Sequence, residues 1–233
     1  MDNHILKIIL WQLFYLNLIN HYILEIISTL GSDYIKLKDD VYVHKTVKIE
    51  EGAYINGPTI ICENSVIRHN AYIRGSVIIG KNSVIGNSTE VKNSILFDRV
   101  ECPHFNYVGD SVLGEHVHLG AGVILSNVRG DKKEVNNLHK YGSILGNNAE
   151  IGCNSVLCPG TIIGKNTNVY PLTRVRGVIG SNKIVKSIIW AFGMYIFTQL
   201  ITIGLIYIIG LFISTGFGSD IYELTFFKSS RLL

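Results

Sequence analysis

An all-β solenoid, a parallel β-helix built from hexapeptide repeats, is the fold class that the sequence predicts, and three observations predict it. An aliphatic residue returns at every sixth position across residues 43–91. A small or branched residue, such as Ala53, Thr59 or Ser65, stands four positions after each of them. The same register resumes across residues 145–175. A period of six is neither helical nor the alternation of an ordinary strand, but it is typical of solenoids whose hexads each form one short strand and one corner.

The repeat also predicts which side chains face the interior. The aliphatic positions are Val43, Ile49, Ile55, Ile61, Ile67, Ile73, Ile79, Ile85, Val91, Leu145, Ile151, Leu157, Ile163, Val169 and Val175. We expect them and their smaller partners, of which Ile95 ends the first run, to fill a narrow triangular prism. The corners read Gly-Lys-Asn at 80–82 and at 164–166, and Gly and Asn tolerate the left-handed backbone of a tight corner. One solenoid is therefore predicted over residues 41–180, interrupted in the middle.

Composition limits the remaining choices. The 233 residues are 47% hydrophobic and only 17% charged, and the apolar excess lies at the two ends of the chain. A net charge of +3, without a basic stripe that contains aromatic residues, gives no indication of a nucleic-acid partner. The cysteines, at positions 62, 102, 153 and 158, have neither CxxC nor zinc-site spacing. We therefore expect reduced thiols in a cytosolic domain rather than disulfides.

Residues 1–34 are predicted to contain an N-terminal amphipathic helix, which covers residues 4–30 and ends at Gly31. Its polar arc consists of Lys7, Asn17, Asn20, His21, Glu25 and Ser28. We expect this helix to plug the open end of the solenoid or to pack between subunits, and a helix on or in a membrane is the alternative. The first residues include no basic segment and no cleavage site follows, so no signal peptide is predicted.

Residues 35–186 are predicted to form the central domain, and residues 187–233 a hydrophobic C-terminal segment. Residues 187–219 contain no charged side chain, and this length is sufficient to cross a bilayer. The basic residues that precede the segment are Arg174, Arg176, Lys183 and Lys186. We predict a membrane anchor with the solenoid on the cytoplasmic side, because basic flanks stay there. A helix buried in an oligomer, or a tail foreign to the domain, are the alternatives.

The chemistry is expected where the register of six fails, from Phe97 to Lys140. Breaks in a solenoid are usually loops, and loops on a rigid scaffold commonly carry function. His104 lies in the first predicted break, and a polar loop from Arg129 to Tyr141 forms the second.

A specific motif lies in this region. Residues 103–114 read Pro-His-Phe-Asn-Tyr-Val-Gly-Asp-Ser-Val-Leu-Gly, and Leu-Gly-Ala-Gly and Ser-Asn follow. With this motif, residues 41–186 resemble the acetyltransferase domain of the bifunctional bacterial enzyme that makes UDP-N-acetylglucosamine. They resemble still more closely the single-domain proteins related to UDP-N-acetylglucosamine pyrophosphorylase. The resemblance implies left-handed coils, a homotrimer with sites between subunits, acetyl-CoA as co-substrate and no required metal.

The resemblance also implies roles for individual residues. His104 matches the general base of the family, and histidine suits this task because its unperturbed pKa is about 6.5. The implied substrate-binding residues are Arg74, Lys92, Tyr107, Asn127 and Lys133. Of these, Arg74 and Lys92 would hold the phosphate, the former as a bidentate fork and the latter as a point charge.

The sequence also departs from the family pattern. His118 replaces an asparagine, Cys153 replaces a serine near acetyl-CoA, and the loop after Gly130 is longer. The N-terminal nucleotidyltransferase domain is not found in this sequence, so we expect no uridylyl transfer by this chain alone.

Three functional hypotheses follow. The first is acetyl-CoA-dependent N-acetylation of an amino-sugar phosphate, most simply glucosamine 1-phosphate. The second is a non-catalytic solenoid that assembles or regulates a separate nucleotide-sugar enzyme. The third is a metal-dependent hydratase that uses His104, His116 and His118, since one class of carbonic anhydrase binds zinc through three histidines on this fold. However, His118 is expected to point outward and His116 to lie at a corner, which disfavours the third.

Overall fold

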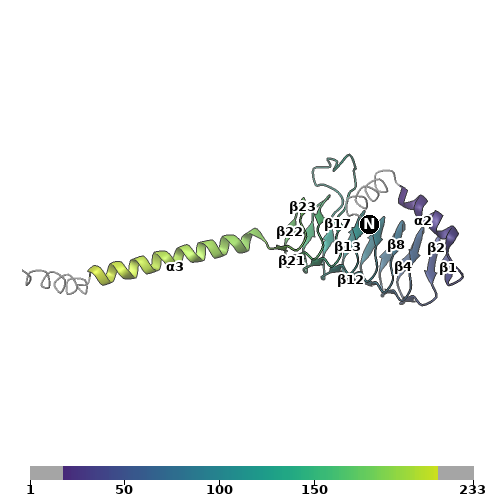
Figure 1. The fold of residues 1–233 in the computed structure, drawn as a ribbon, viewed down its shortest axis with the longest axis horizontal. Helices are drawn as coiled ribbons and strands as arrows, with labels where there is room; N and C mark the ends of the chain where they lie inside the picture. The colour runs from purple at the N-terminus through teal and green to yellow at the C-terminus, as the bar shows by residue number, and fades with distance from the viewer. Residues whose placement is uncertain (1–17, 215–233) are drawn as a thin grey trace, which may run out of the picture. The chain divides into compact units, whose positions relative to one another are not determined.

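A computed structural model describes residues 18–214 and shows the predicted solenoid (Figure 1). Three sheets form its sides, and each circuit of the chain adds one short strand to each sheet. The contact pattern divides the chain into two compact units between Lys186 and Ser187. The fold class predicted from the repeat is therefore confirmed.

The first sheet has nine strands, the second seven and the third eight. The first sheet contains β1 (Tyr34–Lys38), β2 (Val41–His44), β5 (Thr59–Ile61), β8 (Val77–Ile79), β11 (Ser94–Leu96), β14 (Val112–Leu113), β17 (Ile144–Leu145), β20 (Ile162–Ile163) and β23 (Val178–Ile179). The second sheet contains β4 (Tyr54–Ile55), β7 (Tyr72–Ile73), β10 (Glu90–Lys92), β13 (Tyr107–Gly109), β16 (Ile124–Leu125), β19 (Val156–Leu157) and β22 (Arg174–Val175). The third sheet contains β3 (Lys48–Ile49), β6 (Val66–Ile67), β9 (Val84–Asn87), β12 (Glu101–His104), β15 (His118–Leu119), β18 (Glu150–Ile151), β21 (Asn168–Val169) and β24 (Ile184–Val185).

The chain passes from the first sheet to the third, then to the second, and returns to the first. Parallel neighbours in each sheet come from successive circuits, as β5 pairs with β8 and β8 with β11. β1 is the exception, because it pairs antiparallel with β2 and ends the first sheet at its N-terminal side.

The interior contains the aliphatic side chains predicted from the repeat. Ile61, Ile79 and Ile85 have no exposed surface and belong to one continuous core cluster. Burial of such a side chain contributes roughly 2 kcal/mol. Because each circuit stacks the same positions over one another, the period of six in the sequence becomes columns of aliphatic side chains inside the prism.

Small hydroxyl residues occupy the second inward position, and hydrogen bonds explain why. The Ser65 hydroxyl donates to the Gly80 carbonyl at 2.7 Å, and the Thr89 hydroxyl donates to the Cys102 carbonyl at 3.1 Å. Buried backbone carbonyls need a partner, and these short side chains supply one without disturbing the prism. The predicted left-handed corner is also found, since Asn82 has a φ of 55°.

The predicted first break is not a loop. Residues 97–125 continue in strands, and β13 pairs in parallel with both β10 and β16. The chain loses one residue at a corner rather than within a strand, so strand pairing survives and only the count between inward residues changes. For the same reason Ile95 was wrongly predicted to point inward. It lies in a second apolar cluster with Ile19 and Val112, whereas Leu96 takes the inward position.

Helix α2 (Leu18–Thr29) lies against the outer side of the first sheet (Figure 1). Ile19 and Ile23 of this helix are buried, while Asn20, His21 and Glu25 are exposed. The prediction of an amphipathic helix is therefore confirmed over this range. However, α2 covers a side of the solenoid and does not plug its open end. Predicted helical residues 4–17 lie outside the described range.

The second unit contains α3 (Ile188–Ser214). By length and composition, its residues Gly193–Leu211 meet the requirements for a membrane span. Both properties also occur in helices that do not cross membranes, so the membrane anchor stays a prediction.

Candidate active site

Two successive circuits are one residue short at the same corner, where the chain passes from the second sheet to the first. The next inward residue after Val91 is Leu96, which lies five positions later instead of six, and the following circuit repeats this shortening. The residues that turn these corners, Asn93 and Asp110, have φ values of 44° and 50°. Asn and Asp adopt this left-handed backbone more readily than most residues. In the next circuit the same corner carries the only long insertion of the described solenoid, residues 128–141.

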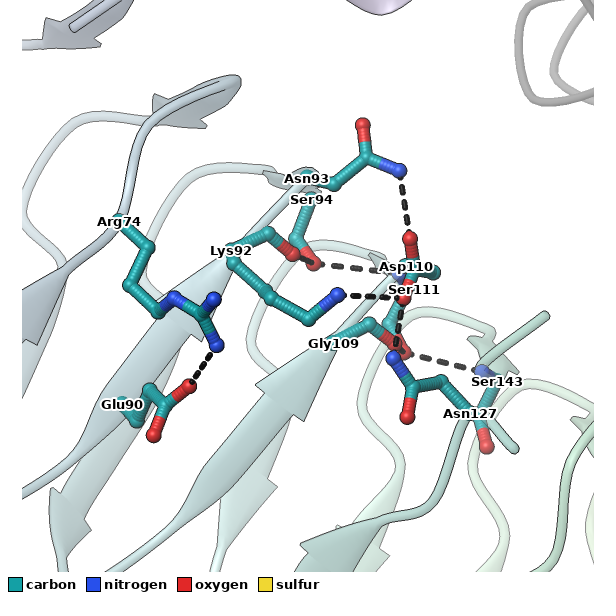
Figure 2. Close-up of polar contacts among 10 residues, drawn as sticks. All are labelled: Arg74, Glu90, Lys92, Asn93, Ser94, Gly109, Asp110, Ser111, Asn127 and Ser143. Carbon is teal, nitrogen blue, oxygen red and sulfur yellow. Dashed lines mark hydrogen bonds and ion pairs between the residues drawn. The ribbon is translucent and has the colours of Figure 1, made fainter. Parts of the chain in front are cut away.

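Asp110 is the centre of a buried polar cluster at this corner (Figure 2). One carboxylate oxygen accepts a hydrogen bond from the Lys92 ammonium at 3.0 Å and another from the Asn127 side-chain amide. The other oxygen accepts a hydrogen bond from the Asn93 side-chain amide at 2.6 Å. The Lys92 side chain is only 14% exposed and that of Asp110 only 6%. Lys92 and Asn127, both predicted to contact substrate, are therefore brought together, but the charge of Lys92 is already balanced.

Arg74 lies outside this cluster. Its guanidinium donates to the Glu90 carboxylate at 2.8 Å, and Figure 2 shows it directed at Glu90. This hydrogen bond raises the pKa of Arg74, and the guanidinium carbon also lies 5.9 Å from the centre of the Tyr72 ring. Both side chains of the Arg74–Glu90 pair are partly exposed on the outer face of the second sheet. An anionic ligand on this face could therefore reach the guanidinium.

Tyr107 reaches the buried cluster from the start of β13. A side chain at Gly109 would place its Cβ 2.7 Å from the Tyr107 hydroxyl and 2.9 Å from the Asn127 amide nitrogen, so glycine leaves room for both groups. Burial raises the pKa of the Tyr107 phenol, and the nearby Asp110 carboxylate adds to the effect. Tyr107 is therefore a neutral hydroxyl at neutral pH, able to donate a hydrogen bond to a ligand.

His104 stands at a different corner, where β12 leaves the third sheet and the chain enters the second. It is exposed, and its backbone amide donates to the Asn106 side chain at 3.2 Å. Its ring lies 6.4 Å from that of Phe105, and no side chain in residues 18–214 forms a hydrogen bond or ion pair with the imidazole. Strand β13 of the second sheet lies between His104 and Asp110, which therefore stand at opposite corners of the same circuit. A single chain therefore does not bring the predicted base to the buried cluster.

Lys133 lies on the long insertion and is exposed. The insertion turns back through an isolated bridge between Val135 and Leu138. At its base, the Arg129 guanidinium donates to both oxygens of Asp131, at 2.8 and 2.6 Å. This fork lowers the pKa of Asp131 to about 2. Within residues 18–214, Lys133 forms no hydrogen bond or ion pair with the buried cluster or with His104, so this geometry alone does not support its predicted substrate role.

A cavity of about 270 Å³ lies between the base of the insertion and the last circuits. Its lining includes Arg129, Arg174 and Arg176, together with Cys158. The Arg174 Nε donates to the Cys158 sulfur at 3.4 Å, which leaves its two terminal nitrogens for other partners. With one carboxylate, Asp131, against three guanidinium groups, the lining is positively charged. The sequence predicted Arg174 and Arg176 only as the flank of the membrane segment and Arg129 only as the start of the polar loop.

Among the described residues, His104, His116 and His118 do not gather into a metal site. His118 forms a contact of 2.9 Å with Glu150, and His116 contacts Arg99 at 3.1 Å. Within the described residues, no group of three His, Cys, Asp or Glu side chains is placed to hold a metal ion. The arrangement of histidines required by the hydratase hypothesis is thus not found in this part of the chain.

Asp110 is the residue that sequence reasoning missed. It stood within the motif, but no role was assigned to it. The signal lay in the coil length, because Lys92 precedes Asp110 by 18 residues and Asn127 follows it by 17, about one circuit in each direction.

Comparisons with known proteins agree with this architecture. Residues 55–192 match the family described as the GMPPB C-terminal domain. The chain is 31% identical over 164 residues to a bifunctional sugar-1-phosphate nucleotidylyltransferase/acetyltransferase of Sulfurisphaera tokodaii. The aligned region covers 66% of this chain and 41% of that protein. It is 34% identical over 201 residues to the bifunctional protein GlmU of Methanococcus maripaludis, and the aligned region covers 72% of this chain and 41% of that protein.

The chain thus spans about two-fifths of the length of these curated relatives. Among solved structures, the UDP-N-acetylglucosamine acyltransferase from Campylobacter jejuni is 19% identical with a TM-score of 0.34, over 61% of this chain and 66% of that one. The predicted resemblance to a hexapeptide-repeat acyltransferase domain of the GlmU type is confirmed by the sequence matches.

Proposed function

Because the chain belongs to the GMPPB C-terminal domain family and resembles hexapeptide-repeat acyltransferases, we propose that it transfers an acetyl group from acetyl-CoA to the amine of an amino-sugar phosphate. Glucosamine 1-phosphate is the simplest acceptor, and the product belongs to nucleotide-sugar biosynthesis. Uridylyl transfer is left to a separate protein in this proposal.

The observation that supports this function best is the state of His104. Its imidazole is exposed and has no side-chain hydrogen-bond partner among the described residues, so it is free to accept a proton. Attack on a thioester requires the amine without its extra proton, and a positioned histidine can remove that proton. The Tyr107 hydroxyl would then stabilise the developing oxyanion of the tetrahedral intermediate, or orient the sugar.

Charge on the second sheet supports binding of the two anionic substrates. Arg74 is exposed enough to form a forked contact with the sugar phosphate by exchanging Glu90 for the ligand. Lys92, already paired with Asp110, would orient the sugar rather than supply net charge. We place the phosphates of acetyl-CoA in the cavity beside Arg174 and Arg176, and Lys133 on the insertion as a further contact.

This mechanism requires more than one copy of the chain. His104 precedes strand β13 and Asp110 follows it, so the two lie at opposite corners of the same circuit, and in this proposal they act on sugars bound by different copies. A cyclic trimer would bring His104 of one copy near the cluster of its neighbour. We also propose that the domain is cytoplasmic and anchored to a membrane through residues 187–219.

The test measures free-thiol release from acetyl-CoA with glucosamine 1-phosphate as acceptor, beside the His104→Gln variant. The matched control is His69→Gln, because His69 is exposed at the same kind of corner, two circuits earlier. We expect a loss of at least 100-fold for the first variant, the lower end of the usual contribution of a general base, and little change for the second. Equal activity of both variants would show that His104 is not the base.

A second candidate function is a non-catalytic module that assembles a separate nucleotide-sugar enzyme. The pairing of Lys92 with Asp110 favours it, since a phosphate-binding lysine is more effective without a buried carboxylate. No turnover by the folded, oligomeric parent across several amino-sugar phosphates would favour this candidate.

A further inference from the structure

The last two circuits of the solenoid have an unusual charge distribution. Between residues 151 and 219 there is no Asp or Glu, whereas residues 165–186 contain five basic side chains. Three of them are lysines on one part of the surface, together with exposed aromatic and aliphatic residues. We call this the terminal patch, and it consists of Lys165, Tyr170, Leu172, Lys183, Ile184 and Lys186.

Strand pairing brings the terminal patch together. β21 and β24 are neighbours in the third sheet, with Asn168 opposite Ile184. The Lys186 ammonium lies 4.9 Å from the centre of the Tyr170 ring, and the Asn182 amide at the next corner donates to the Lys165 carbonyl at 2.9 Å. The patch therefore belongs to the folded solenoid and not to the segment that follows it.

The apolar members of the patch are unusually open. Leu172 is 73% exposed and Ile184 is 66% exposed, although the corresponding outward positions of earlier circuits are mostly polar. The nearest carboxylate on this sheet, Glu150, is already in contact with His118 at 2.9 Å. Within residues 18–214, the patch thus combines lysines that form no ion pair with apolar side chains that are exposed.

We infer that the terminal patch binds the anionic phospholipid headgroups of a membrane surface. Lysines near such a surface gain electrostatic attraction, while Tyr, Leu and Ile side chains enter the boundary between headgroups and acyl chains. Only one residue, Ser187, separates the patch from α3, whose composition suits a bilayer. This continuity favours lipid over nucleic acid or an acidic protein, for which an adjacent apolar helix has no purpose.

The test uses the full chain in phosphatidylcholine nanodiscs with or without about 30% phosphatidylglycerol. Cys153 is a native reporter, because it is exposed and its carbonyl accepts the Leu172 amide at 2.9 Å. We measure its modification by a water-soluble maleimide with peptide mass spectrometry. Cys62, in the early circuits, is the internal reference. Anionic lipid should slow modification of Cys153 several-fold relative to Cys62.

A triple variant with Lys165, Lys183 and Lys186 changed to Gln should abolish the lipid dependence. Each lysine near an anionic surface changes the docking equilibrium about fivefold, so three together change it roughly a hundredfold. The control changes Lys36, Lys38 and Lys48 to Gln, which removes equal charge from the other end of the solenoid.

Equal Cys153 rates in both lipid compositions would overturn the proposal, as would a lipid effect that the triple variant retains or the control removes. Slow maleimide modification of Cys153 in detergent as well as in both lipid compositions would also overturn the proposal, because protein rather than lipid would then cover the patch. This inference rests on the proposed membrane anchor, but acetyl transfer is not measured, so the result is independent of the proposed catalytic activity.

Discussion

Replacement of Asp110 by Asn tests whether the buried cluster holds the shortened corner together. The side chains keep the same shape, but the carboxylate that accepts from Lys92, Asn93 and Asn127 is lost. One side of the asparagine amide is an NH2 group, which cannot accept a hydrogen bond from these donors. Lys92 is left with a buried charge and no counter-ion, since its side chain is only 14% exposed.

We expect the free energy of unfolding to fall by about 3 kcal/mol, near the lower end of the cost of breaking a buried ion pair. The lower end applies because Lys92 keeps some contact with water and can turn outward. Urea denaturation followed by circular dichroism at pH 7 measures the change, provided that the transition is two-state.

Glu90→Gln is the matched control, because it removes one carboxylate from the Arg74 pair on the exposed face of the same sheet. We expect Glu90→Gln to change the free energy of unfolding little, since partly exposed ion pairs contribute little to stability. A double variant, Asp110→Asn with Lys92→Met, should recover part of the lost stability by removing the stranded charge. Equal effects of Asp110→Asn and Glu90→Gln would refute the reasoning.

Three further predictions concern the insertion, the thiols and the core. The fork from Arg129 lowers the pKa of Asp131 to about 2, so its contribution to the folded state is present above pH 4 and is lost only as the pH falls through about 2. A carboxyl-carbon NMR titration should show this midpoint, and a midpoint near the ordinary 3.8 would contradict it. Burial raises the pKa of the Cys102 thiol, so maleimide near neutral pH should modify exposed Cys153 in the folded chain but Cys102 only after denaturation. Ile85→Ala should lower the free energy of unfolding by about 3 kcal/mol through loss of burial and a residual cavity, and a change under 1 kcal/mol in a urea titration would show that the core closes around it.

The sequence was sufficient to predict the solenoid because each hexad repeats one physical requirement. Ile61 and Ile79 must fill the same column, and a small residue must fit beside them, so the period is visible without knowledge of contacts between circuits. It was insufficient at Ile95, where the sequence keeps the period of six but the corner has lost a residue. The inward position then passes to Leu96, and α2 covers the side chain left outside.

The site was predictable only in part, for a related reason. His104 and the residues of the motif were identified by resemblance, which needs only local order. The role of Asp110 depends on which residues lie one circuit away, and the length of a circuit changes from 18 residues, as between Thr59 and Val77, to 17 where the corners shorten, as between Val91 and Val108. A fixed period of six therefore misaligns the partners of Asp110 at the circuits where the cluster forms.

In the proposed mechanism, stability and chemistry therefore depend on different corners of the second sheet. Asp110 is buried and holds three donors, so its replacement should affect unfolding and substrate binding together. His104 is exposed and supports no side chain among the described residues, so its replacement should affect turnover while the unfolding transition stays the same. If His104→Gln lowered the unfolding free energy as much as Asp110→Asn, the histidine would be a structural part of its corner, and the case for a catalytic base would lose its main support.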